Sequence, residues 1–118
     1  MLVNLKEILK IPQEKGNAIG CFNAPNLTSI RAIMKAAEEL SQPVSLTHAQ
    51  IHEEKGLVTM EESMSMMMHF AKNTDLPVCL HLDHGTDLDY IKRGLELGFT
   101  SVMYDGSVLP FEENAKNT

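Results

Sequence analysis

The densest group of chemically capable side chains is the run His81-Leu82-Asp83-His84-Gly85. A neutral imidazole is a good zinc ligand, and a neighbouring carboxylate can act as a general acid or base while the metal polarises a carbonyl oxygen. A catalytic zinc ion usually takes three protein ligands, however, and this segment offers one or two. Structural alternatives stand beside the chemical one: His81 packs within a strand, and Asp83 caps a helix that begins near Asp87.

Three further polar positions follow apolar runs in the same way. Asn23 follows the run 18–22, His48 follows 44–47, and Asp105-Gly106-Ser107 follows 100–104. In a parallel α/β sheet the binding site lies beyond the carboxyl ends of the strands, so all of these positions open onto one face together with Asp83. The amides of Gly106 and Ser107 could receive a phosphate, or these residues could form a tight turn.

A second pair of histidines, His48 and His52, stands four residues apart. On a helix the two would share a face and could form a metal pair. The surrounding stretch 48–56 is polar and contains Glu53 and Glu54, which predicts a solvated, flexible loop after the second strand. A loop that covers the substrate is the functional variant of this interpretation.

The elements that must position these residues alternate along the chain. Residues 4–15 form a short leading helix with Asn4 as N-cap and Glu7 three residues on, ending near Pro12 or Gly16. Apolar runs then predict buried strands, and apolar residues spaced by three and four predict helices between them. Methionines 60, 64, 66, 67 and 68 fill the core and the helix 60–71, and His69 lies on its surface.

This alternation predicts four successive βα units with parallel strands and right-handed crossovers, starting near residues 18, 44, 78 and 101. The last segment, 110–118, begins a further helix. An eight-stranded βα barrel usually takes about 250 residues. We therefore predict an α/β fold in which residues 1–118 are the N-terminal half of a single TIM-barrel domain.

Composition narrows the possible functions. The formal net charge is −6 and no cluster of basic residues occurs, so nucleic acid and anionic membranes are poor partners. We find no membrane span and no secretion signal. Cys21 and Cys79 lie in apolar runs and predict reduced thiols in the cytoplasm. No lysine falls in a predicted strand, which favours a metal over a Schiff base for any carbonyl chemistry.

Three segments carry a resemblance to a known family. Gly20-Cys21-Phe22-Asn23, the run 78–85 and the run 101–107, followed by Pro110-Phe111-Glu112-Glu113-Asn114, resemble the class II, zinc-dependent ketose-bisphosphate aldolases in order and spacing. The resemblance runs the whole chain. It implies a (β/α)8 barrel of which this is the N-terminal half, a sugar bisphosphate as the small-molecule partner, and a homo-oligomer.

The resemblance also implies roles for individual residues. Asp83 matches the catalytic acid/base, which exchanges a proton with the hydroxyl at the carbon–carbon bond being cleaved, and His84 matches the first zinc ligand. Asp105 matches an acidic position near the metal, Ser107 follows in the same motif, and Asn23 matches an asparagine at the substrate end of the first strand. The family cleaves fructose or tagatose 1,6-bisphosphate reversibly to dihydroxyacetone phosphate and glyceraldehyde 3-phosphate, with Zn²⁺ stabilising the enediolate.

Two departures from the family pattern leave questions open. Tyr104 stands where an aliphatic residue is usual, and the loop 47–53 lacks the serine common after this strand, so the sugar stereochemistry is not fixed. The two other zinc-binding histidines and the phosphate loops lie on later strands of the family. We therefore predict that the isolated chain is inactive. The alternatives are a non-catalytic half-barrel that self-associates or serves as a structural or regulatory partner, and an unrelated flavodoxin-like binding domain.

Overall fold

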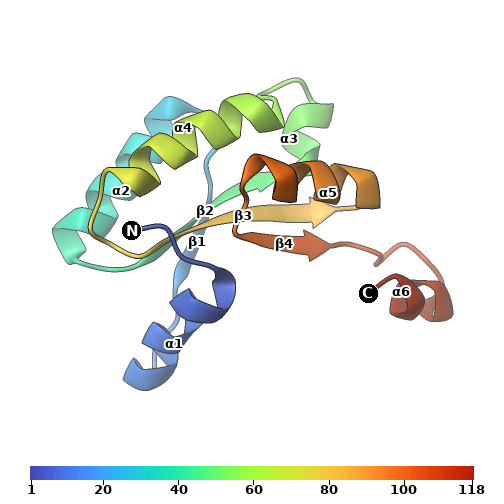
Figure 1. Ribbon diagram of the computed structural model, residues 1–118, viewed down its shortest axis with the longest axis horizontal. Coiled ribbons are helices and arrows are strands. Elements are labelled where there is room, and N and C mark those ends of the chain that lie inside the picture. Colours follow the sequence, from blue (N-terminus) through green and yellow to red (C-terminus); the bar gives the residue numbers. More distant parts are fainter.

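The computed structural model describes residues 1–118 and shows strands and helices in alternation (Figure 1). No helix has the length and apolar character needed to cross a membrane. The elements, in chain order, are α1 (Leu5–Lys15), β1 (Gly20–Asn23), α2 (Leu27–Leu40), β2 (Val44–Ala49), α3 (Gln50–Glu54), α4 (Met60–Lys72), β3 (Val78–Gly85), α5 (Leu88–Leu97), β4 (Ser101–Tyr104) and α6 (Phe111–Asn117).

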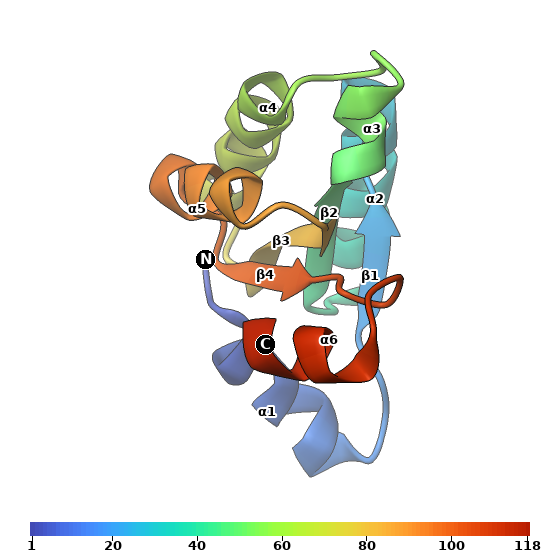
Figure 2. The same ribbon diagram turned by 90° about the vertical axis from the view of Figure 1, so that its right-hand side faces the viewer.

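The four strands form one parallel sheet in the order β1-β2-β3-β4. Each strand pairs with the next one along the chain, and helices connect them. Figures 1 and 2 show α2, α4 and α5 on one face of this sheet, α1 near the other, and α6 beyond the end of β4. The arrangement agrees with the prediction of a partial TIM barrel, and the strands begin at residues 20, 44, 78 and 101.

The main core lies between the sheet and the helices on that covered face. Side chains alternate across a strand, so Val44 and Leu46 of β2 point to the same face as Val78, Leu80 and Leu82 of β3. These residues are buried in one cluster with the helix residues Ile30, Met34, Met60, Met64, Met67 and Ile91. Met66 and Met68 pack against it, and His69 is exposed, as predicted.

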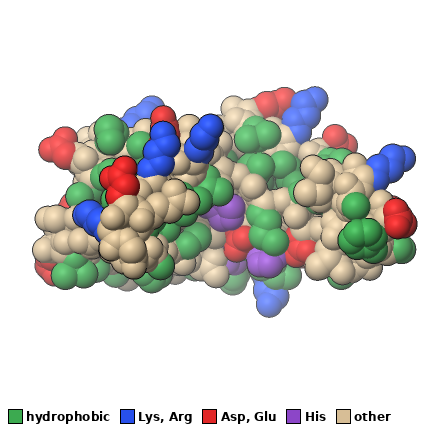
Figure 3. Space-filling view, turned by 90° about the horizontal axis from the view of Figure 1, so that it is seen from below, with side chains coloured by type: hydrophobic (Ala, Val, Ile, Leu, Met, Phe, Trp, Pro, Cys, Tyr) green, Lys and Arg blue, Asp and Glu red, His purple; other side chains and the backbone are tan.

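The opposite face of the sheet, called the inner face below, carries mostly small and polar side chains. By alternation its residues are Cys21, Asn23, Ser45, Thr47, Ala49, Cys79, His81, Asp83, Ser101 and one large apolar residue, Met103. The interior of a TIM barrel is usually filled by bulky branched residues. Figure 3 views the molecule from this side and shows histidine and acidic side chains gathered near its middle. The inner face is therefore suited to binding and chemistry more than to dense apolar packing.

The leading helix has the predicted cap. The Asn4 side chain accepts from the Glu7 amide, and the Glu7 carboxylate accepts from the Asn4 amide. Pro12 lies inside the helix, and Gly16 ends it with a left-handed backbone at φ 67°. Of the two predicted endpoints, Gly16 is the correct one, because a residue without a Cβ adopts that conformation at no steric cost.

Two strands extend further than the sequence pattern indicated. β2 continues through His48 and Ala49, and β3 continues through Asp83 to Gly85. The predicted loop 48–56 is wrong: after β2 the chain turns directly into α3, and His48 and His52 are buried. Neighbouring strands supply the partners that keep these polar residues in the sheet, since Ala49 lies opposite Asp83.

The last two elements are tied together by the residue that departs from the family pattern. Tyr104, at the end of β4, packs against the main core. Its hydroxyl accepts a hydrogen bond of 2.9 Å from the side-chain amide of Asn117 in α6. The bulk of Tyr104 is thus accommodated on the helix side of the sheet, and its polar end anchors the predicted final helix.

Candidate active site

The carboxyl ends of β3 and β4 bring four of the predicted site residues together: Asp83, His84, Asp105 and Ser107. The two strand ends are joined by a hydrogen bond of 2.8 Å from the Asp105 amide to the Gly85 carbonyl. This bond places the loop after β4 beside the last residues of β3. The helix cap of α5 is Asp87, so the alternative that Asp83 caps this helix is wrong.

His84 has a left-handed backbone, with φ 49°, and a side chain that is 57% exposed. Its Nδ1 lies 2.7 Å from Asp105 Oδ2, and its Nε2 lies 3.7 Å from Asp83 Oδ2. The hydrogen bond with Asp105 and the charge of Asp83 raise the pKa of His84 above its ordinary value. When the ring is neutral, Asp105 holds the proton on Nδ1 and leaves the Nε2 lone pair available.

Asp105 is fixed in turn by Ser107. The Ser107 amide donates to Asp105 Oδ1 over 3.0 Å. Hydrogen bonds from the Ser107 hydroxyl and from His84, followed by the bond from the Ser107 amide, lower the pKa of Asp105 to about 2. The carboxylate therefore stays ionised over the whole range in which His84 titrates. Gly106 and Ser107 thus form a turn in which the Ser107 amide supplies a hydrogen bond to the Asp105 carboxylate.

Asn23 lies at the same end of the sheet but on a different strand. In the strand register it stands opposite Thr47, which stands opposite His81, which stands opposite Ser101. Asn23 is exposed, and β2 separates it from β3. The structure therefore places Asn23 on the face and at the end shared by Asp83 and Ser107, without bringing it into the cluster formed by β3 and β4. The catalytic and binding roles of these residues stay predictions.

The second histidine pair belongs to the covered face of the sheet. His48 is fully buried, its Nε2 lies 3.0 Å from the Tyr90 hydroxyl, and its ring meets that of His52 edge to face at 5.5 Å. His52 Nδ1 accepts from the Ala49 amide over 3.2 Å. The flexible loop is a wrong interpretation, because these rings pack against each other and His52 caps α3, and the metal pair stays a prediction. The alternation Val44, Leu46, His48 was the signal for a buried histidine.

Glu53, in α3, is the centre of the polar cluster around His48. Its carboxylate accepts from the Tyr90 hydroxyl at 2.9 Å, from Arg93 at 2.9 Å and 3.1 Å, and from the Met60 amide at 3.3 Å. Burial raises the pKa of Glu53, but the hydrogen bonds from Arg93 and Tyr90 outweigh it and lower the pKa. The cluster joins α3 to α4 and α5.

Gln50 is a residue that the sequence interpretation missed. Its side-chain oxygen accepts from the Thr86 amide over 2.9 Å, so the first residue of α3 holds the loop that follows β3. Thr86 is two residues after His84. Local residue spacing does not signal this contact, because the two residues are 36 positions apart.

The hydrogen bond between His84 and Asp105 gives the His84 ring one feature of a metal ligand. An imidazole that donates through one nitrogen to a carboxylate and presents the other is the common arrangement of a zinc-binding histidine. His84, with Asp105 behind it, has this geometry. No group of three His, Cys, Asp or Glu side chains in the chain converges as a metal site. The geometry of His84 is therefore that of a single metal ligand.

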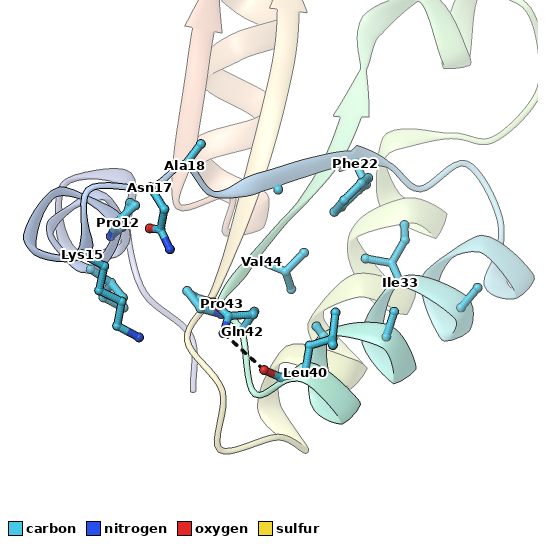
Figure 4. A pocket seen from close by; sticks show the side chains of 15 residues that line it. Pro12, Lys15, Asn17, Ala18, Phe22, Ile33, Leu40, Gln42, Pro43 and Val44 are labelled. Atoms are coloured by element: carbon cyan, nitrogen blue, oxygen red, sulfur yellow. Dashed lines mark hydrogen bonds between the residues drawn. The ribbon is translucent and has the colours of Figure 1, made fainter.

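A separate apolar pocket of about 440 Å³ lies near the edge strand β1 (Figure 4). Side chains from α1, β1 and α2 line it, among them Pro12, Phe22, Ile33 and Leu40. Lys15 is its only charged residue. None of the predicted site residues lines this pocket, so its apolar hollow is distinct from the polar cluster at the carboxyl ends of β3 and β4.

Comparisons with known proteins agree with this geometry. The sequence profile described as "Fructose-bisphosphate aldolase class-II" matches residues 3–118. The chain is 39% identical to a fructose-bisphosphate aldolase of Staphylococcus aureus (strain Mu50) over 99% of its own length and 41% of that protein's. It is 38% identical to a sulfofructosephosphate aldolase of Alkalicoccus urumqiensis, over 96% of this chain and 39% of that protein.

Solved structures give the same result. The YdjI aldolase of Escherichia coli K12 superposes with a TM-score of 0.89 at 30% identity, over 98% of this chain and 44% of that one. A protein of Coccidioides immitis that is assigned as a fructose-1,6-bisphosphate aldolase superposes with a TM-score of 0.83 at 28% identity. The match covers 96% of this chain and 39% of that one. This chain spans about two fifths of the length of these relatives. A profile match over nearly every residue, with the Asp83-His84 pair at the carboxyl end of β3, shows that the chain belongs to the class II fructose-bisphosphate aldolase family.

Proposed function

We propose that this chain supplies the proton-transferring half of a zinc-dependent aldolase site that acts on a ketose 1,6-bisphosphate. The observation that carries the proposal is the linked series Asp83, His84 and Asp105 at one end of the sheet, joined by contacts of 3.7 Å and 2.7 Å. Fructose and tagatose bisphosphates are the proposed substrates, and dihydroxyacetone phosphate and glyceraldehyde 3-phosphate are the products.

In the cleavage direction, Asp83 takes the proton from the hydroxyl on the carbon that becomes the aldehyde. The carbon–carbon bond then breaks, and its electron pair remains on the ketone fragment as an enediolate. A zinc ion, when bound, would polarise the ketone carbonyl and stabilise that negative charge. In the condensation direction Asp83 returns the proton. Its carboxylate is partly exposed and 3.7 Å from His84, close enough for one substrate to meet both side chains.

The neighbouring residues prepare these two groups. Asp105 keeps the His84 proton on Nδ1, so that Nε2 faces the proposed ligand position. Ser107 holds Asp105, and Asn23 lies at the same end of the sheet to meet the substrate.

The isolated chain is expected to be inactive, because one histidine does not complete a catalytic zinc site. The direct test adds the chain to fructose 1,6-bisphosphate with zinc and measures release of triose phosphate. Turnover that disappears in Asp83→Ala would overturn the expectation.

A chimera tests the activity itself. Residues 1–118 replace the matched region of the Staphylococcus aureus relative, and the purified protein is assayed with both ketose bisphosphates. We expect zinc-dependent cleavage of at least one. A folded, zinc-loaded chimera that cleaves neither substrate would contradict the proposal.

One observation favours the alternative of a self-associating half-barrel. The edge of β1 is unpaired, and Phe22 and Leu40 beside it are 49% and 69% exposed. Unpaired strand edges and contiguous exposed apolar surface are typical of interaction sites. A concentration-dependent dimer in light scattering that Phe22→Lys abolishes would support this alternative, and a monomer at all concentrations would exclude it.

A further inference from the structure

His81 is the one histidine of the inner face that the proposed function does not use. It lies in the middle of β3, two residues before Asp83, and alternation puts both side chains on the inner face. The His81 side chain is only 14% exposed. In the register of the sheet it stands directly opposite the buried Ser101 of β4.

Both ring nitrogens of His81 have a polar neighbour. Nδ1 lies 2.7 Å from the Ser101 hydroxyl oxygen, a hydrogen-bond distance. Nε2 lies 3.4 Å from Asp83 Oδ1, slightly longer than a hydrogen bond between well-aligned groups. The ring thus bridges a hydroxyl on one strand and a carboxylate on its own strand.

The protonation of the ring follows from its neighbours. An ionised carboxylate can only accept, so a favourable contact with Asp83 requires a proton on Nε2. A neutral imidazole then has a bare Nδ1, and the Ser101 hydroxyl can donate to it. The contact with Asp83 therefore selects the tautomer, and the Ser101 hydroxyl, which can donate or accept, is compatible with it as the donor.

The two oxygens of Asp83 consequently have different surroundings. Oδ1 faces His81 inside the sheet, whereas Oδ2 faces His84 at the open end, 3.7 Å from its Nε2. Of the other buried titratable groups, His52 feels the charge of Asp83, and His48 and Cys79 make their hydrogen bonds elsewhere.

We propose that His81 is a positioning residue: the Ser101 hydroxyl holds the ring through Nδ1, and the Nε2–H that faces Asp83 keeps the carboxylate in one orientation. The chemical use of that orientation rests on the proposed function. The orientation of the Asp83 carboxylate does not depend on that function, since it can be measured in the chain without any turnover.

The first measurement is the tautomer of His81 in the 118-residue chain, from long-range ¹H–¹⁵N spectra at mildly alkaline pH. We expect a protonated Nε2 and a bare Nδ1. Asp83→Ala should shift both ¹⁵N resonances toward an average of the two tautomers, whereas Ser45→Ala, the control on the same face, should leave them unchanged. Ser45 also lies on the inner face, but its hydroxyl donates to the Cys79 carbonyl. A proton on Nδ1 in the unmodified chain would overturn the proposal, and that measurement needs no variant.

The second measurement is the side-chain rotamer of Asp83, from three-bond couplings to its carboxyl carbon. We expect one rotamer in the unmodified chain, loss of that preference in His81→Phe, and its recovery in His81→Gln, whose amide can donate. A purely structural role for the ring would leave the Asp83 couplings equal in the Phe and Gln variants, and that result would overturn the proposal. A fixed Asp83 in a chain whose chimera does not turn over would contradict the proposed function alone.

Discussion

Two histidine–carboxylate clusters lie on opposite faces of the sheet and use the same side-chain types differently. On the covered face, His48 is fully buried, and its partner Tyr90 donates to Glu53, which Arg93 neutralises. On the inner face, His84 is 57% exposed and keeps Nε2 free of any hydrogen bond. Residue type is thus a poor guide to chemistry, because burial and spare bonding capacity decide what a cluster can do.

The proton arrangement of the covered cluster shows why it is structural. The single hydroxyl proton of Tyr90 goes to Glu53, so Tyr90 must accept from His48 Nε2–H. His48 Nδ1 is then left as a bare acceptor with no partner. Burial, followed by the nearby His52, lowers the pKa of His48 to about 4. Its ring is neutral, enclosed and inaccessible to a substrate.

The largest expected difference between the clusters is in catalysis. In the active chimera, Asp83→Ala should lower kcat by roughly a thousandfold, as expected for loss of a general acid or base, without loss of zinc. The measurement is a coupled assay of triose phosphate release. Asp75→Ala, which removes an exposed carboxylate from the loop before β3, is the control. A similar loss in both variants would place the effect in folding.

The second effect concerns acid stability and belongs to the covered cluster. Because the folded pKa of His48 is about 4 and the ordinary value is 6.5, the unfolded chain binds the extra proton between these pH values. Stability should therefore fall as pH decreases through that window, with a contribution of about 3 kcal/mol from His48. Urea unfolding of the chain and of His48→Gln measures it. Parallel pH profiles in the two proteins would contradict this assignment.

The third effect tests whether Glu53 holds the covered cluster together. Glu53→Ala leaves Tyr90 and Arg93 without their acceptor and should lower the free energy of unfolding by about 2 kcal/mol. Glu54→Ala is the matched control, since Glu54 is exposed on the same helix and should change stability by at most about 0.5 kcal/mol. Equal effects in denaturant titrations would remove Glu53 from its central position.

The smallest effect sharpens the description of the inner cluster. The hydrogen bond with Asp105 raises the pKa of His84, so its stabilising contribution is complete below the ordinary value and is lost as pH rises through the raised one. In the metal-free chain, NMR titration of His84 should give a midpoint above the ordinary value of about 6.5. Asp105→Asn should bring it down. An unchanged midpoint would show that Asp105 does not control this ring.

The sequence predicted the fold well where apolar periodicity was strong. The runs at 44 and 78 and the helix stripe through Ile30 and Met34 correspond to β2, β3 and α2. The prediction was wrong at residues 48–56, where polar side chains indicated a loop. There the chain forms α3, because partners distant in sequence, Tyr90 and Arg93, satisfy the polar groups. Local pattern contains no information about such partners.

The candidate site was predictable in its location and less so in its connections. Polar residues after strands pointed to Asp83, His84, Asp105 and Ser107, and the structure brings these four together. The link from Gln50 to Thr86 and the contact of His81 with Ser101 were not visible, since both depend on the packing of neighbouring elements.

The left-handed backbone of His84 has a consequence for laboratory evolution. A residue with a Cβ is held in this conformation at a cost of roughly 1 kcal/mol that glycine avoids. A library sorted only for heat resistance or protease survival should therefore enrich glycine or asparagine at position 84. The enriched variants would be more stable but would lack the imidazole of His84. Any campaign to harden this protein should accordingly keep position 84 fixed, or screen for retained metal affinity alongside endurance.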